Sequence, residues 1–378
     1  MQYSNSFKMK YYIIAGEASG DLHASNLMKA LKEVDTDANF RFWGGDLMEN
    51  QGGKLVKHYK ELAFMGFSEV IMNLRTIFRN IKFCKQDIES YNPDVIIFVD
   101  YPGFNMRIAE WAKKKGYRTS YYISPQIWAW KENRIKKIKR DVDEMYVILP
   151  FEKDFYTEKH NFPVHFVGHP LLDAIDNRPL VDIKLFKKNN GLDNRPIIAL
   201  LPGSRKQEIE KMLNVMLSIT SEFKDYQFVI AGAPSQDKEF YRGFIKKSNI
   251  SIIKNKTYDV LSISHAALVT SGTATLETAL FKVPEVVCYK GSYISYHIAK
   301  RIINLDYISL VNLIMDREVV TELIQNEFNT KNLKTELTKI LNEENRKRIF
   351  EDYFELEQKL GGKGASKKTA ELIYNNIK

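Results

Sequence analysis

Residues 11–21 are YYIIAGEASGD, a short apolar run that leads into a glycine-containing turn. The run from Tyr11 to Ala15 is typical of a buried strand, and helical periodicity from Leu22 to about Lys32 predicts a helix after the turn. A buried strand joined by a tight turn to a helix is the repeating unit of a parallel, doubly wound sheet. This stretch therefore predicts an α/β fold.

The same pattern repeats along the chain and divides it into two halves. Further strands are expected at residues 39–43, 95–99, 119–123 and 144–148, and in the second half at residues 197–201, 227–230, 251–253, 267–269 and 285–288. Helices are expected at residues 205–223, 275–281 and 295–303, and after Asp316 the pattern is wholly helical. The polar stretch 173–195 separates the halves. We therefore expect two Rossmann-like domains that face each other across a cleft, with ligands at the carboxyl ends of the strands.

Composition and charge limit the classes of function. The chain has 378 residues and a formal net charge of +9, from 56 Lys and Arg against 47 Asp and Glu, which favours anionic partners. Its two cysteines, Cys84 and Cys288, form no metal-binding pair and fit a reducing compartment. The polar start of the chain lacks the apolar core of a signal peptide, and no apolar stretch is long enough to span a bilayer. We expect a cytoplasmic protein and leave attachment to a membrane surface open.

Two loops of the second half have the composition of an anion site. Gly203, Ser204 and Arg205 follow an expected strand and open a helix, where backbone N–H groups, a hydroxyl and a cation can bind phosphate. An ordinary turn with Ser204 as the helix N-cap is the alternative. The sequence contains no P-loop motif, so phosphate binding of that type is not supported.

The second loop is SGTATLE, residues 271–277, and it also follows an expected strand. Its small and hydroxyl residues can contact a pyrophosphate, and the acid about one helical turn later can accept hydrogen bonds from both ribose hydroxyls. A capping box is the alternative for this pattern. Two such loops at neighbouring strand ends favour a nucleotide diphosphate, and the candidate residues of this loop are Ser271, Gly272, Thr273, Thr275 and Glu277.

The turns of the first half carry acids instead. Glu17 and Asp21 would repel a pyrophosphate, so this turn favours sugar hydroxyls as partners, with Ser19 and Asp21 as candidate acceptor contacts. His23 lies in the first turn of the expected helix and, from the residues alone, is interpreted as a surface histidine.

Asp100 ends the expected strand 95–99, within the sequence VDYPGFN. A carboxylate at a strand end is a candidate general base, and an Asp that only caps the helix near Asn105 is an equally good interpretation. Asn105 itself is a candidate contact to the acceptor.

Aromatic and basic residues follow the next strand. Trp128 and Trp130 precede the cation-rich run 131–140, which includes Arg134. This combination can receive a lipid phosphate, or it can be a solvated basic helix. The acceptor candidates here are Trp128 and Arg134.

Apolar residues at helical spacing, with cations among them, are found near residue 75. They can lie in a membrane interface or form an ordinary stripe that faces the core. The candidate membrane residues are Phe67, Ile71, Leu74, Ile77, Phe78 and Ile81.

These motifs in this order resemble the lipid-A-disaccharide synthase family, over nearly the whole chain from Met9. Small departures are His23, where members often carry an aliphatic residue, and Gln126, where Ser is frequent. The motifs that carry the resemblance are AGEASGD at 15–21, VDYPGFN at 99–105, YISPQIWAW at 122–130, LPFEKDFY at 149–156, FVGHPLLD at 166–173, LLPGSRKQEIE at 200–210, SGTATLE at 271–277 and DYISLVNLI at 306–314.

The resemblance implies a GT-B fold with a C-terminal helix that returns to the N-terminal domain. The expected domains are residues 1–172 plus about 355–378, for the acceptor and the membrane, and residues 173–354, for the UDP donor. It also implies that UDP-2,3-diacylglucosamine and 2,3-diacylglucosamine 1-phosphate are joined through a β-1,6 linkage on the inner face of the inner membrane of a Gram-negative bacterium. The family's essential residues correspond to Asp100, Arg205, Glu277, Asn312 and Gln325, of which Asn312 and Gln325 are expected at the donor.

Inversion at the anomeric carbon needs a base for the acceptor 6-hydroxyl. Asp100 is the first choice, with Glu17 and His23 in reserve. Arg205, loop amides and a helix N-terminus can stabilise the leaving UDP, so neither a metal nor another cofactor is expected.

Two other functions remain open at this level. A UDP-sugar epimerase of the same fold would share the nucleotide loops but would not need the apolar helix near Phe78. A basic scaffold for membranes or nucleic acid needs charge spread over one face, whereas the polar groups here converge on strand ends. We therefore expect no nucleic acid partner.

Overall fold

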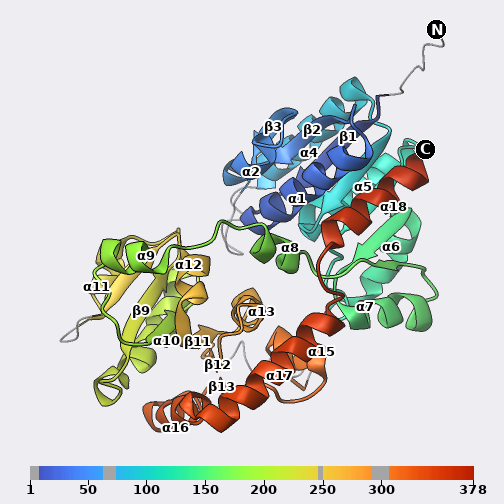
Figure 1. Ribbon diagram of the computed structural model, residues 1–378. Helices are drawn as coiled ribbons and strands as arrows, with labels where there is room; N and C mark the ends of the chain where they lie inside the picture. Colours follow the sequence, from blue (N-terminus) through green and yellow to red (C-terminus); the bar gives the residue numbers. More distant parts are fainter. Residues whose placement is uncertain (1–7, 63–73, 246–249, 292–305) are drawn as a thin grey trace. The chain divides into compact units, whose positions relative to one another are not determined.

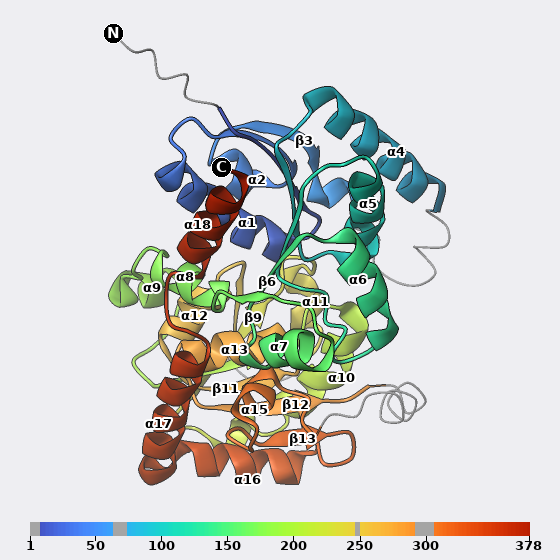
Figure 2. The same cartoon turned by 90° about the vertical axis from the view of Figure 1, so that its right-hand side faces the viewer.

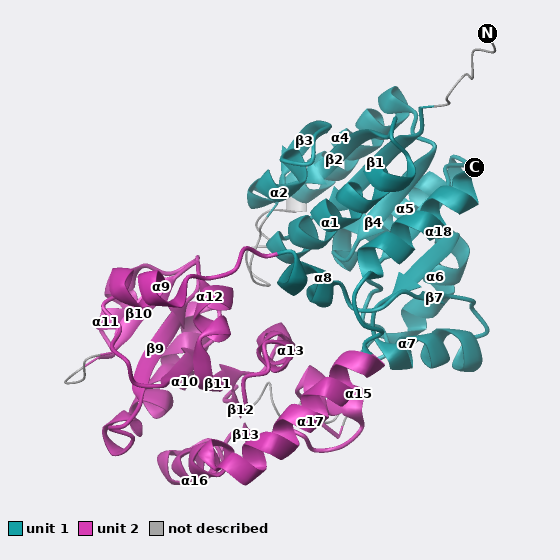
Figure 3. Cartoon of the chain, viewed as in Figure 1, with its two compact units in different colours: residues 1–177, 360–378 teal, residues 178–359 magenta. Residues whose placement is uncertain are grey.

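The protein was analysed as a computed structural model that describes residues 8–62, 74–245, 250–291 and 306–378 (Figure 1). The chain divides into two compact units (Figure 3). Unit 1 comprises Met1–Asn177 and Leu360–Lys378, and unit 2 comprises Arg178–Lys359. Each unit has its own sheet and its own hydrophobic core.

Unit 1 is built on a seven-stranded parallel sheet in the order β3-β2-β1-β4-β5-β6-β7. The strands are β1 (Lys10–Ala15), β2 (Asn39–Gly44), β3 (Lys54–His58), β4 (Val95–Val99), β5 (Thr119–Tyr122), β6 (Glu144–Val147) and β7 (His165–Phe166). The first six follow the dinucleotide-fold order 3-2-1-4-5-6, in which the chain reverses direction between β1 and β4. Ligands of such sheets bind at the carboxyl ends of the strands beside this switch point.

The central strands are buried on both faces, as expected for a parallel sheet between two helical layers. Every residue of β4 is buried, and β1 is buried apart from Lys10. On one side α5 contacts α4 and α6, and on the other α1 contacts α2, α8 and α18 (Figure 2). The helices are α1 (Ala18–Val34), α2 (Asp46–Glu49), α4 (Leu74–Tyr91), α5 (Pro102–Lys114), α6 (Ile135–Asp141), α7 (Pro150–Asp154), α8 (Pro170–Asp176) and α18 (Ala365–Ile377).

The last helix of the chain belongs to unit 1, which confirms the expected return of the C-terminus. The Asp173 carboxylate at α8 accepts hydrogen bonds from the backbone N–H groups of Gly364 (2.7 Å) and Ser366 (2.8 Å), at the start of α18. A carboxylate at a helix N-terminus satisfies amides that lack partners within the helix. Asp173 therefore fastens α18 against α1 and α8.

Unit 2 repeats the topology with six parallel strands in the order β10-β9-β8-β11-β12-β13. The strands are β8 (Ile197–Leu201), β9 (Gln227–Gly232), β10 (Ser251–Lys254), β11 (Ser264–Thr270), β12 (Glu285–Tyr289) and β13 (Glu322–Ile324). The helices are α9 (Ile183–Asn189), α10 (Lys206–Leu217), α11 (Lys238–Arg242), α12 (Thr257–Ser262), α13 (Thr273–Leu280), α15 (Leu310–Met315), α16 (Thr330–Leu341) and α17 (Glu343–Lys359). In chain order this is again 3-2-1-4-5-6, with the switch point between β8 and β11.

The structure corrects three expectations about elements. The chain after Asp316 is not wholly helical, because β13 adds an edge strand to the sheet beside β12. The first helix begins at Ala18 rather than Leu22. Asp21, which was expected in the turn, lies inside α1 and accepts a hydrogen bond from the Gly45 N–H before α2. The helix expected at residues 205–223 is shorter in the structure, where α10 ends at Leu217. The helix expected at residues 295–303 lies outside the described residues.

Candidate functional site

The first group of candidate residues lies at the switch point of unit 1. β1 and β4 are neighbours in which Ala15 is paired with Val99, so Glu17 and Asp100 leave adjacent strands at the same edge. Gly16 makes this approach possible, because a Cβ there would lie 2.2 Å from the ring of Tyr101. The structure thus brings together the two acids that were proposed as bases.

Asp100 sits in an unusual backbone conformation. Asp100 and Tyr101 have φ angles of 46° and 49°, in the left-handed region that non-glycine residues seldom adopt. Each such residue costs about 1–3 kcal/mol and persists only where the surroundings impose it. The Asp100 carbonyl oxygen accepts hydrogen bonds from Asn105 Nδ2 and from the Tyr121 hydroxyl, both at 2.7 Å.

The acidity of Asp100 suits proton transfer near neutral pH. Burial first, and then the negative charge of Glu17, raise the pKa of its carboxyl from 3.8 to about 6, although the hydrogen bond from the Tyr101 N–H opposes the rise. The side chain does not cap α5, whose N-cap is Tyr101 and has no side-chain cap. This geometry does not support the interpretation of Asp100 as a simple helix cap, and its role as a general base stays a prediction.

Two candidate acceptor contacts are already engaged inside the fold. Asp21 is buried, and its carboxylate accepts hydrogen bonds from the N–H groups of Gly45 (2.7 Å), Leu47 (3.1 Å) and Met48 (3.1 Å). Asn105 is fully buried and directs its amide nitrogen at backbone carbonyls. Both side chains thus bond to backbone groups of unit 1, and their contact with the acceptor stays a prediction.

His23 is buried rather than on the surface, which corrects its interpretation as a surface histidine. Its side chain is 7% exposed, and burial lowers its pKa to about 4, although the charge of Asp173 opposes the shift. A lowered pKa makes the imidazole a weaker base, which does not favour His23 for proton transfer. Ser19 and Glu17, in contrast, are exposed at the start of α1.

The loop after β5 is organised by a residue that the sequence interpretation missed. Glu152 of α7 is buried and accepts hydrogen bonds from the Ser124 hydroxyl (2.7 Å), Trp128 Nε1 (3.2 Å) and two backbone N–H groups. Its position in the motif LPFEKDFY was the available signal. Glu152 fixes the half-buried Trp128, while Trp130 is exposed beneath Lys131 (4.3 Å) and Arg134 (5.5 Å).

The helix proposed for membrane contact has two different faces. Ile81 is buried in the core of unit 1, which does not favour its contact with a membrane, and the half-buried Ile77 packs against that core. Phe78 and Phe83 are 59% and 44% exposed, and Arg107 lies 6.0 Å from the Phe78 ring. Phe67 and Ile71 lie outside the described residues, and so does the side chain of Leu74. Within the described residues no helix is both long and apolar enough to cross a membrane.

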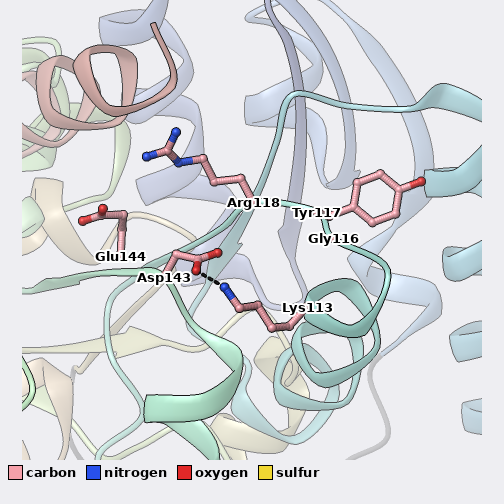
Figure 4. A pocket seen from close by; sticks show the side chains of 6 residues that line it. All are labelled: Lys113, Gly116, Tyr117, Arg118, Asp143 and Glu144. Atoms are coloured by element: carbon pink, nitrogen blue, oxygen red, sulfur yellow. Dashed lines mark hydrogen bonds and ion pairs between the residues drawn. The ribbon is translucent and has the colours of Figure 1, made fainter.

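One pocket of unit 1 lies away from the candidate residues. It is lined by Lys113, Gly116, Tyr117, Arg118, Asp143 and Glu144, with an ion pair between Lys113 and Asp143 (Figure 4). These residues lie near the amino ends of β5 and β6, whereas Asp100 follows the carboxyl end of β4. The pocket is therefore separate from the switch point.

In unit 2 the two anion loops come from the strands on either side of the switch point. Gly203, Ser204 and Arg205 follow β8, and residues 271–277 follow β11, its neighbour. Arg205 is exposed, and among the described residues its guanidinium makes no hydrogen bond or ion pair. The Ser204 N–H donates to the Glu208 carboxylate (3.1 Å), so a carboxylate already occupies one anion-binding group of this loop.

The loop after β11 presents uncapped helix amides. Gly272 is the N-cap of α13 with φ of 155°, a conformation that only glycine adopts readily, and α13 has no side-chain cap. The capping-box interpretation is therefore wrong for this helix. Gly272 and Thr273 are exposed, and Ser271 is half-buried and donates to the Ile308 carbonyl (3.1 Å). Thr275 is fully buried and its hydroxyl donates to the Gly272 carbonyl (2.9 Å), so this geometry does not favour its contact with the donor.

Glu277 has a partner that the sequence did not reveal. The hydroxyl of Tyr258, on α12, donates to Glu277 Oε1 at 3.2 Å. Burial raises the pKa of Glu277, and this hydrogen bond opposes the rise. Tyr258 precedes Glu277 by 19 residues in a segment without a recognisable motif, so no sequence signal pointed to it.

Asn312, which was predicted at the donor, forms four side-chain hydrogen bonds within unit 2. It is fully buried, its amide nitrogen donates to Val320 O (2.8 Å) and Glu322 Oε1 (3.0 Å), and its amide oxygen accepts from the N–H groups of Val319 (2.8 Å) and Val320 (3.0 Å). These bonds use both donors and both acceptor sites of an Asn amide. Gln325 differs, because its Nε2 is buried without a partner among the described residues at the carboxyl end of β13.

Among the described residues no three His, Cys, Asp or Glu side chains lie together as a metal site would require.

A family model described as Lipid-A-disaccharide synthetase matches residues 11–376. The lipid-A-disaccharide synthase of Syntrophus aciditrophicus is 38% identical over 376 residues, covering 97% of this chain and 97% of that protein. That of Coxiella burnetii is 37% identical over 370 residues, covering 97% and 98%.

Solved structures with the same architecture are more distant in sequence. UDP-GlcNAc 2-epimerase from Neisseria meningitidis, bound to UDP-GlcNAc, has a TM-score of 0.69 at 15% identity, covering 97% of this chain and all (100%) of that one. The glycotransferase of kitacinnamycin has a TM-score of 0.65 at 11% identity, covering 98% and 100%. At these identities the likeness shows the fold alone, the two-domain α/β architecture of GT-B glycosyltransferases and epimerases.

Proposed function

The chain belongs to the lipid-A-disaccharide synthetase family, and on that premise we propose that it joins UDP-2,3-diacylglucosamine to 2,3-diacylglucosamine 1-phosphate. Its family makes it a lipid A glycosyltransferase. The proposed product is a β-1,6-linked disaccharide 1-phosphate, formed with inversion and release of UDP. The observation that carries the mechanism is Asp100, a constrained carboxylate with a pKa of about 6 beside Glu17 at a topological switch point.

Unit 2 is proposed to bind the donor. Arg205 and the exposed N-terminus of α13 at Gly272 and Thr273 would hold the diphosphate, because uncapped amides and a free guanidinium stabilise developing negative charge. Glu277 would accept hydrogen bonds from the ribose hydroxyls, and the unpartnered Gln325 amide would donate to the donor.

Unit 1 is proposed to bind the acceptor and to supply the base. The Asp100 carboxylate would take the proton of the 6-hydroxyl as that oxygen attacks the anomeric carbon and the bond to UDP breaks. Glu17 keeps the Asp100 pKa raised and is the reserve base. Trp128, Arg134 and the exposed Ser19 would contact the acceptor.

The reaction is tested by incubating the purified protein with both lipid substrates and measuring the products by mass. A tetraacyl disaccharide 1-phosphate and an equal amount of UDP support the proposal. Conversion of the UDP-sugar alone into an isomer would support an epimerase instead. If neither substrate is consumed although UDP binds, the assigned reaction is wrong.

Membrane contact is proposed through the exposed face of α4, on the inner face of the inner membrane. Phe78 and Phe83 lie there among the exposed cations Arg75, Arg79 and Lys82, a combination that suits an interface of anionic lipid. Trp130 with Lys131 and Arg134 adds a second aromatic and cationic group in the same unit.

Replacing Phe78 and Phe83 with Ser is expected to lower partitioning onto phosphatidylethanolamine–phosphatidylglycerol vesicles at least about tenfold, since burying one Phe contributes about 1.5–3 kcal/mol. Sedimentation with the vesicles measures the change. The thermal midpoint should hardly move, because both side chains are exposed. Phe354→Ser, at an exposed Phe of unit 2, is the matched control. Unchanged partitioning of the double variant would contradict the proposed face.

Replacing Glu277 with Ala is expected to raise the donor KM about 10–100-fold, because hydrogen bonds to a charged group contribute about 1.5–3 kcal/mol. Tyr258→Phe should raise it about fivefold, since the carboxylate loses the donor that orients it. In the Glu277→Ala background, Tyr258→Phe should add little. Steady-state kinetics with varied donor give these values, and Tyr353→Phe, at a buried tyrosine of α17, is the control. A fall in acceptor affinity alone would place Glu277 elsewhere.

A further inference from the structure

The buried amide of Asn105 and the hydroxyl of Tyr121 converge on one atom, the carbonyl oxygen of Asp100. Each donor lies 2.7 Å from that oxygen, which satisfies both of its lone pairs. Asn105 is 0% exposed, as is Tyr121. Both side chains are enclosed in unit 1, and these two hydrogen bonds are made within the protein.

The place of this carbonyl in the sheet explains why it needs side-chain donors. The Asp100 N–H still bonds in the sheet, donating to the Tyr122 carbonyl at 3.0 Å. The left-handed φ angles of Asp100 and Tyr101 then turn the chain out of β4 and into α5. The strand therefore ends at Asp100, and the direction of the Asp100 side chain depends on the groups that bond to its carbonyl oxygen.

Asn105 also ties this pivot to the neighbouring strand. Its Nδ2 lies 3.3 Å from the Ile14 carbonyl of β1 and 3.4 Å from the Val99 carbonyl of β4, in addition to the shorter bond to Asp100. One side chain thus links the carboxyl ends of the two strands that flank the switch point. The strands carry Glu17 and Asp100, so the separation of these two acids depends on it.

We propose that Asn105 and Tyr121 are positioning residues for the glycosyl transfer: by clamping the Asp100 carbonyl they hold its carboxylate in the orientation that accepts the acceptor proton. The inference rests on the proposed function of Asp100 as the base. Glu17 before α1 and Glu152 of α7 are the charged groups that act on the Asp100 carboxyl, and neither is altered by the test below.

The test compares Asn105→Ala and Tyr121→Phe with wild type, with kcat measured against pH. Asn105→Ala is expected to lower kcat about 10²-fold, because a misplacement of about 1 Å costs that much. The donor KM should stay within about twofold, since the donor loops belong to unit 2 and lose no contact. Tyr121→Phe keeps the ring and should lower kcat less, about tenfold or under, because one of the two donors remains.

The pH profile separates positioning from damage to the fold. A carboxylate released from its buried pose loses desolvation, so the acid limb of kcat should move down from about pH 6 toward the ordinary aspartate value of 3.8. Partial unfolding would lower kcat without moving the limb. Tyr11→Phe, which removes a buried hydroxyl bond to Asp35 in the same unit, is the matched control and should leave the limb in place.

The outcomes also separate this inference from the proposed function. If Asp100→Asn abolishes turnover while Asn105→Ala and Tyr121→Phe keep the wild-type kcat and acid limb, Asn105 and Tyr121 are not positioning residues. The assignment of Asp100 as the base then survives. If Asp100→Asn itself retains turnover, the proposed base is wrong. Should Asn105→Ala fail to fold, Tyr121→Phe decides, and an unchanged acid limb with unchanged kcat overturns the proposal.

Discussion

Replacing Asp100 with Asn is expected to lower kcat by about 10²–10⁴-fold, the loss typical of a missing general base. Asn keeps the shape of the side chain and the left-handed backbone is well tolerated by Asn, so the site geometry should survive. UDP binding, measured by calorimetry, should be nearly intact, because the proposed donor contacts lie in unit 2. The loss should therefore appear in kcat and not in the donor KM.

The pH dependence gives the same prediction an independent readout. A base must be deprotonated, so wild-type kcat should fall as the pH drops through about 6, the raised pKa of Asp100. The Asn variant should lose that limb. Its thermal midpoint at pH 8 should be no lower than that of wild type, since above pH 6 the folded protein holds an ionised carboxylate that burial disfavours.

Retention of most activity by Asp100→Asn would contradict the assignment. Glu17 would then be the base to test, since it is exposed beside Asp100. His23 is the weaker alternative, because it is buried and burial lowers its pKa to about 4.

Replacing Arg205 with Ala is expected to lower kcat/KM for the donor by about 10²–10³-fold, as for one lost stabilising donor at a developing anion. The guanidinium is exposed and makes no ion pair within the described residues, so the fold should lose less than about 0.5 kcal/mol. Steady-state kinetics and thermal unfolding measure the two effects. Arg205→Lys should be intermediate, because it keeps the charge but not the bidentate geometry.

Lys211→Ala is the matched control for charge. Lys211 is an exposed cation on α10, the helix that Arg205 precedes, so its removal changes the net charge equally. A general electrostatic effect would lower donor affinity in both variants and vanish at high salt, where exposed charges are screened. Near-normal turnover of Arg205→Ala would remove this residue from the donor site.

The fold was largely predictable because its signal is local. Buried parallel strands are continuous apolar runs, so β4 and β8 were predicted with their observed bounds. Three of the four edge strands, β3, β7 and β13, were missed, because they are short or only partly buried, whereas the edge strand β10 was predicted. The family resemblance, carried by the same strand-end motifs, is confirmed by the match over residues 11–376.

The candidate site was predictable in place but not in the role of each residue. Glu17, Asp100 and Arg205 follow strands that flank the switch points, as the motifs indicated. Asp21, Asn105 and Asn312 belong to the same motifs, yet their side chains hold backbone. Tyr258 and Glu152 hold site residues and were missed. Tyr258 lies outside any recognised motif, and Glu152 lies inside LPFEKDFY, but its partners Ser124 and Trp128 come from another part of the chain.

The sequence by itself determined the two parallel sheets, the loops at their carboxyl ends and the family. Only the tertiary structure decided which polar side chains of those loops are free to meet a ligand. The physical reason is that apolar periodicity is a pattern among residues close in sequence. A buried polar group, in contrast, needs a hydrogen-bond partner, and that partner can come from any part of the chain. Asn105 reaches the carbonyl of Ile14, 91 residues away, and Asp21 reaches the amide of Gly45, 24 residues away.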